Sequence, residues 1–121
     1  VGGGTGIVEA QVSRAEKDGI TLRYGTKATR LLMDQVGSVT GIEVRGPDGL
    51  STIPARAIVL SSGGFQANSE MRARYLGKDW DLARVRGTPF NTGDGIRMAL
   101  EVGAQPFGHG TSCHAVAWDY N

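Results

Sequence analysis

The chain lacks the residues that a disulfide, a polyanion-binding surface or a membrane span requires. Its 121 residues include one cysteine, Cys113, so no internal disulfide can form. A single cysteine is compatible with a reducing compartment, and we expect a cytoplasmic location. Lysine and arginine number 13 against 12 acidic residues, and the net charge of +1 gives no electrostatic case for nucleic acid. The longest apolar runs, such as residues 57–60, are too short to cross a membrane.

Glycine, in contrast, is abundant. The chain contains 19 glycines, more than twice the usual frequency of roughly 7%. They cluster at positions 2–4, at 63–64, and at 93 and 95. Glycines at strand ends and helix starts let a backbone approach a ligand closely. This clustering is typical of a nucleotide cofactor site.

Hydrophobic periodicity predicts helices and strands in alternation. Helices are expected over residues 5–18, 68–76 and 94–102. Strands are expected over residues 20–24, 28–33, 39–45, 50–53 and 57–60. Gly46-Pro47-Asp48-Gly49 is a strong turn signal between two of these strands. The continuous apolar run 57–60 suits a strand buried on both faces.

This order of elements predicts an α/β layered structure with a β-meander and an incomplete sheet. One buried strand and three helices are too few to close a doubly wound sheet. The chain begins at Val1 without an initiator methionine or a signal-peptide pattern. It ends as abruptly at Asn121. We therefore expect an internal fragment, with residues 1–121 forming one partial domain.

The strand-to-helix segment 57–65 is the first candidate ligand site. It delivers Ser61, Ser62, Gly63 and Gly64 to the carboxyl end of a predicted strand, where open α/β sheets bind their ligands. From these residues alone, a ligand site and a plain strand-to-helix turn are equally good interpretations.

Asp94 is the second candidate. It lies between Gly93 and Gly95 at the start of a predicted helix. Thr92 or Asp94 is able to cap that helix, and a carboxylate there suits the helix dipole. A cap does not require two flanking glycines, so we favour a role for Asp94 in accepting a cofactor hydroxyl or ring N–H.

Three other features give weaker evidence of a binding site. Residues 2–6 precede a helix but follow no strand, so a helix-entry loop is preferred to a phosphate site. His109, Cys113 and His114 match no common zinc spacing, and we expect no metal site. A basic stretch is usually a solvated helix face, although in a substrate channel it would attract an anion. This stretch consists of Arg72, Arg74, Lys78, Arg84 and Arg86.

Taken in order, these segments resemble the FAD-binding superfamily of fumarate reductase, succinate dehydrogenase and related flavoproteins. The matching segments are residues 60–65 with Asn68, then 92–95, 98–99, 103–104 and 113–114. The sequence of residues 86–100, together with that of residues 113–117, is most similar to tricarballylate dehydrogenase-like members of this superfamily. The resemblance covers essentially the whole chain and implies part of a Rossmann-like FAD/NAD(P)-binding domain.

The resemblance also implies site residues. Contacts with FAD are expected from Ala28, Ser61, Ser62, Gly63, Gly64 and Asp94. The family has alanine and then threonine or cysteine where this chain has Ser61-Ser62, a departure that keeps the side chains small. His114 is expected to help hold the carboxylate of the substrate.

The implied activity is hydride transfer between a di- or tricarboxylate and flavin N5, with an electron donor or acceptor that the sequence leaves open. The family's first glycine motif is expected upstream and its cap and catalytic arginines downstream. We therefore expect no catalytic residue in this chain, and an isolated fragment that is inactive. A ketosteroid dehydrogenase-like enzyme is the alternative within the family. A non-catalytic nucleotide-binding or interaction module is the alternative outside it.

Overall fold

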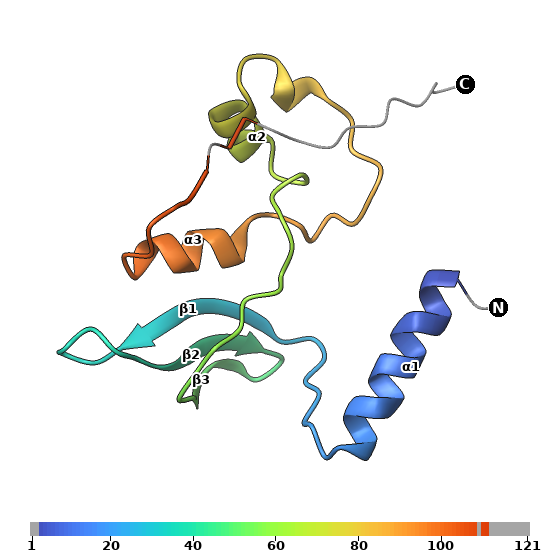
Figure 1. The fold of residues 1–121 in the computed structure, drawn as a ribbon, viewed down its shortest axis with the longest axis vertical. Coiled ribbons are helices and arrows are strands. Elements are labelled where there is room, and N and C mark those ends of the chain that lie inside the picture. The colour runs from blue at the N-terminus through green and yellow to red at the C-terminus, as the bar shows by residue number, and fades with distance from the viewer. Residues whose placement is uncertain (1–2, 109, 112–121) are drawn as a thin grey trace.

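The computed structural model describes residues 3–108 and 110–111. These residues form three α-helices, one short 3-10 helix and one three-stranded sheet, and Figure 1 shows how the elements are arranged. The elements are α1 (Gly3–Lys17), β1 (Lys27–Met33), β2 (Val39–Gly46), β3 (Gly49–Pro54), α2 (Ser69–Leu76), η1 (Trp80–Leu82) and α3 (Asp94–Glu101).

The three strands form an antiparallel meander in the order β1-β2-β3. Pro47 and Asp48 form the turn between β2 and β3, because Gly46 and Gly49 are paired across it. The α/β class and the β-meander predicted from the sequence are thus confirmed. The strand expected over residues 20–24 is absent, and these residues form an irregular connection between α1 and β1.

A bulge at Thr29 shapes the buried face of the sheet. Ala28 pairs with Val44 and Leu31 pairs with Ile42, so one extra residue lies between the two pairs on β1. In a regular strand without a bulge, Ala28 and Leu31 would point to opposite faces, since they are three residues apart and strand side chains alternate. The bulge therefore brings both to the face that Val44 occupies.

The core lies between this face and α3, which covers β1 in Figure 1. Among the described residues, the buried hydrophobic side chains are Leu31, Val44 and Met98. They come from β1, β2 and α3 respectively. This small core fixes α3 on the sheet, and the N-terminus of α3 is where Asp94 lies.

The segment 57–60 differs from the prediction of a buried strand. It has no strand partner among the described residues, and the side chain of Val59 is 89% exposed. A strand exists only where a neighbouring strand accepts its backbone hydrogen bonds, and an apolar run alone does not supply one. In Figure 1 the segment runs from β3 past α3 towards α2.

The helices agree with prediction to within two residues at each end. Asn68 is the N-cap of α2, and its side-chain oxygen accepts a hydrogen bond from the Met71 amide.

The expectation of a solvated basic face is wrong for Arg72, which is 7% exposed, whereas its helix neighbour Arg74 is exposed. Arg72 is buried because carbonyl groups of the following loop surround its guanidinium.

Candidate functional site

Two loops that are distant in sequence lie side by side before α3. The Gly93 amide donates to the Gly64 carbonyl at 3.1 Å, and the Ala67 amide donates to the Asn91 carbonyl at 3.0 Å. These bonds pair the loop that leads into α2 with the loop that leads into α3. The two glycine-bearing segments singled out in the sequence therefore form one structure.

The junction, where the loop that leads into α2 meets the loop that leads into α3, is closely packed. This packing explains several of its glycines. A Cβ atom on Gly63 would lie 3.0 Å from Oδ1 of Asn91, and one on Gly95 would overlap Oγ of Ser62. Gly93 has a φ of +80°, and a Cβ there would overlap Sδ of Met71. Protein packing thus accounts for these three glycines. The case for a ligand rests on what the junction exposes.

Asp94 is the charged group of the junction. Oγ1 of Thr92 donates to its carboxylate at 2.6 Å, and Nζ of Lys27 lies 3.2 Å from the same oxygen. Nη2 of Arg97 is 3.7 Å from the other oxygen. The hydrogen bond from Thr92 and the positive charges of Lys27 and Arg97 lower the pKa of Asp94, against a smaller opposing effect of burial. Asp94 is therefore an ionised acceptor at neutral pH.

No side chain caps α3. Its N-cap is Gly93 in the left-handed conformation, with no side-chain hydrogen bond to the helix. The expectation that Thr92 or Asp94 caps this helix is therefore wrong, because the Thr92 hydroxyl is directed to the Asp94 carboxylate instead.

The start of β1 also contacts the junction. Lys27 reaches Asp94, and Nη2 of Arg97 donates to the Thr29 carbonyl at 3.1 Å. Ala28 lies between these two contacts and is half-buried. Sequence reasoning missed Lys27, since no spacing in the chain links it to Asp94. It also missed Arg97, although the i, i+3 spacing of Asp94 and Arg97 on a predicted helix was a signal that could have found this pair.

The predicted cofactor residues thus converge on the N-terminal end of α3. Ser61, Ser62 and Gly63 are exposed there, beside an Asp94 side chain that is 28% exposed. An exposed backbone with small side chains admits close approach of a ligand. A carboxylate accepts a hydroxyl or ring N–H and repels phosphate, so Asp94 suits a sugar or a ring rather than a pyrophosphate. His114 lies outside the described residues.

Replacing Thr92 with valine is expected to raise the pKa of Asp94. The lowered pKa means that ionised Asp94 stabilises the folded state above about pH 4, and that this contribution is lost as pH falls through the folded pKa. Valine removes the hydroxyl that is the largest cause of the lowering. A ¹³C NMR titration of the carboxyl groups in the intact protein measures the change.

Thr40→Val is the control, since the Thr40 hydroxyl donates to the Leu32 carbonyl and not to a carboxylate. An unchanged Asp94 titration in Thr92→Val contradicts the assignment.

The described residues contain neither a candidate metal site nor a candidate membrane-spanning helix. Within residues 3–108 and 110–111, no group of three or more His, Cys, Asp and Glu side chains is placed to hold a metal ion. In the same part of the chain, no helix combines the length and the apolar character needed to cross a membrane.

The α/β fold and the glycine-bounded junction define part of a cofactor-binding domain. The chain belongs to the FAD binding domain family, FAD_binding_2, whose model matches residues 1–118. FAD is therefore the cofactor indicated, as the resemblance implied.

Three known proteins are similar to this chain over most of its length. A probable fumarate reductase of Shewanella frigidimarina is 33% identical over 102 residues, which are 84% of this chain and 17% of that protein. The open conformation of a flavocytochrome c3 fumarate reductase matches with a TM-score of 0.76 and 32% identity, covering 80% of this chain and 17% of that one. The 3-ketosteroid Δ1-dehydrogenase of Sterolibacterium denitrificans matches with a TM-score of 0.69 and 34% identity, covering 75% and 17%.

These relatives confirm the resemblance to fumarate reductase-like flavoproteins, and they include the ketosteroid branch as well. The chain spans 17% of the length of each of these three relatives. The finer likeness to tricarballylate dehydrogenase stays a prediction.

Proposed function

We propose that this chain is part of the FAD-binding domain of a longer flavin-dependent oxidoreductase. The observation that carries the proposal is the convergence at α3. There the exposed segment 61–63 lies beside an ionised Asp94, which Thr92 and Lys27 hold. Small side chains, exposed backbone and one oriented acceptor are what a flavin nucleotide requires of such a junction.

Each predicted cofactor residue has a role in this proposal. Asp94 accepts a hydrogen bond from a hydroxyl or ring N–H of FAD. Ser61 and Ser62 offer hydroxyl groups, and Gly63 and Gly64 bring the backbone to van der Waals distance. Ala28 contributes a backbone contact from β1. When bound, FAD supplies the hydride chemistry through its N5 atom, while the protein binds and orients.

The longer protein is proposed because the described residues leave much apolar surface uncovered. Ile7 and Val8 on α1, Tyr24 before β1, and Val59 are all more than half exposed. Large exposed apolar areas mark surfaces that another part of a protein covers. We expect the chain by itself to hold FAD weakly and to be catalytically inactive. A self-sufficient nucleotide-binding module would instead show tight stoichiometric FAD binding by residues 1–121 alone.

The substrate proposed is a di- or tricarboxylate such as fumarate, succinate or tricarballylate, with His114 binding one carboxylate. Two of the relatives described above are named fumarate reductases, which supports this choice. A 3-ketosteroid is the second candidate, because the steroid dehydrogenase has a similar identity over a similar share of this chain. Steady-state assays of the intact protein with both substrate classes distinguish them. Turnover of the steroid without turnover of any carboxylate would overturn the first choice.

Replacing Asp94 with asparagine tests the cofactor site itself. The change keeps the size of the side chain and removes the charge that Thr92 and Lys27 orient. A hydrogen bond to a charged group contributes about 1.5–3 kcal/mol, so the dissociation constant for FAD is expected to rise roughly 10- to 100-fold. Titration of FAD into the apo form of the intact protein, followed by flavin fluorescence, measures it.

Glu43→Gln is the matched control for this experiment. Glu43 is also a carboxylate with a lowered pKa, caused first by the hydrogen bond from Thr29 and then by the charge of Arg30. It lies on the sheet face opposite to Val44, away from α3. FAD affinity of the Asp94 variant equal to that of the Glu43 variant would reject the proposed role of Asp94.

A further inference from the structure

The Asn68 side chain makes two hydrogen bonds of different kinds. Its oxygen Oδ1 accepts from the Met71 amide at 3.1 Å and so caps α2. Its nitrogen Nδ2 donates to the Thr92 carbonyl at 3.0 Å, across 24 residues of sequence. One amide therefore ties the start of α2 to the loop that leads into α3.

The second bond reaches the residue that orients Asp94. Thr92 accepts from Asn68 through its carbonyl and donates to the Asp94 carboxylate through its hydroxyl. The residues on either side of Thr92 are held by backbone bonds, from Ala67 to the Asn91 carbonyl and from Gly93 to the Gly64 carbonyl. At Thr92 itself, the Asn68 side chain takes the place of a backbone donor.

We propose that Asn68 is a positioning residue for the FAD site, which holds Thr92 so that the threonine hydroxyl directs Asp94 towards the cofactor. This inference rests on the proposed function of Asp94. An N-cap alone requires only a side-chain oxygen, and Asp and Ser serve there as well as Asn. The bond to Thr92 additionally requires a donor, and the amide of Asn68 presents an oxygen and an N–H group at once. The second requirement is thus what selects asparagine.

Asn68→Asp separates the two roles. The carboxylate keeps the cap and suits the helix dipole, but it has no N–H and faces the Thr92 carbonyl with a negative charge. We expect this variant of the intact protein to bind FAD roughly 10-fold more weakly and its Asp94 to titrate at higher pH. Asn68→Ser is the second variant. Serine caps the helix without any change of charge, and its single hydroxyl is too short to serve both partners.

A double-mutant cycle with Thr92→Val distinguishes positioning from a general structural role. If Asn68 acts through the Thr92 hydroxyl, Asn68→Asp weakens FAD binding in wild-type protein and has little further effect in the valine background. Equal effects in the two backgrounds would overturn the inference. So would FAD binding by both Asn68 variants at the wild-type dissociation constant.

Asp94→Asn, measured in parallel, separates failure of this inference from failure of the proposed function. If Asp94→Asn weakens FAD binding while both Asn68 variants bind normally, only the role of Asn68 is rejected. If Asp94→Asn also binds normally, the cofactor site itself is misplaced, and the inference is rejected with it. Thermal unfolding of each apo variant identifies any loss of affinity that follows from unfolding.

Discussion

Replacing Arg72 with methionine is expected to destabilise the intact protein by about 3 kcal/mol or more. The guanidinium is almost completely buried, and it donates to four backbone carbonyls. These belong to Gln66 at 2.5 Å, Trp80 at 2.9 Å, Asp81 at 3.0 Å and Ala83 at 3.2 Å. Methionine fills a similar volume but leaves these acceptors without their donor, so the loop after α2 loses its attachment to the helix.

Urea unfolding of the intact protein measures this loss. Arg74→Met is the matched control on the same helix, because Arg74 is exposed and lies 5.5 Å from the centre of the Tyr75 ring. An exposed cation–π contact contributes about 0.5–1 kcal/mol, so the control is expected to lose no more than that. Arg72→Lys retains a cation with three donors and is expected to recover only part of the stability. Equal losses in the Arg72→Met and Arg74→Met variants would contradict the structural role of the four bonds.

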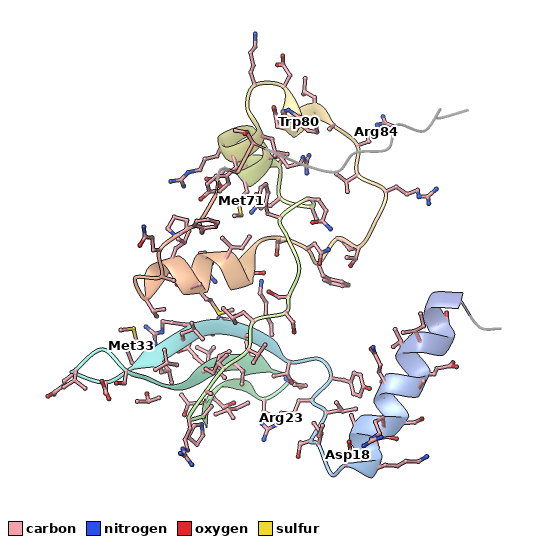
Figure 2. All side chains as sticks on the ribbon, viewed as in Figure 1. Asp18, Arg23, Met33, Met71, Trp80 and Arg84 are labelled. Atoms are coloured by element: carbon pink, nitrogen blue, oxygen red, sulfur yellow. The ribbon has the colours of Figure 1, made fainter. Side chains whose placement is uncertain are left out.

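Replacing Gly93 with alanine is expected to cost about 2–4 kcal/mol, from left-handed strain together with overpacking. Gly93 is buried at the N-cap of α3 with a φ of +80°. An added Cβ would overlap Sδ of Met71 and lie 3.0 Å from Cβ of Phe65. Figure 2 shows Met71 on the side of α2 that faces α3. Relief of this overlap displaces the first turn of α3 and Asp94 with it, so FAD affinity is also expected to fall.

Gly103→Ala isolates the backbone contribution. Gly103 has nearly the same φ, +85°, but no atom lies within 4 Å of a Cβ placed there. The control therefore carries the strain without the overlap, at a cost of about 1 kcal/mol. Shortening Met71 to alanine in the Gly93→Ala background is expected to restore part of the stability and of the FAD affinity. A Gly93→Ala protein as stable as the Gly103→Ala protein would show that the overlap at Met71 has no energetic consequence.

Local signals in the sequence predicted the local features of this structure. The sequence predicts a helix that starts at residue 68, and Asn68 caps it, because an N-cap depends on residues within one turn. The turn at Pro47-Asp48 was identified because its residues by themselves restrict the backbone. Both predictions are confirmed, since the physics that decides them acts over four or five residues.

Features that depend on distant partners were not predictable in the same way. The run 57–60 indicates burial, but the part of the chain described by the structure contains no strand beside it. The burial of Arg72 depends on carbonyls eight to eleven residues further on, whose direction is set by η1. The sequence contained no sign of either partner.

The sequence by itself determined the class of protein, because ordered glycine and aspartate segments identify an FAD-binding family that the comparison then confirmed. It also singled out Asp94 as a candidate cofactor residue. Only the tertiary structure decided which distant group pairs with that carboxylate. Thr92 and Arg97 are near neighbours of Asp94 along the chain, whereas Lys27 reaches it because α3 packs on β1 over the Leu31–Met98 core. Contacts between distant segments follow from packing, and no spacing within the chain encodes them.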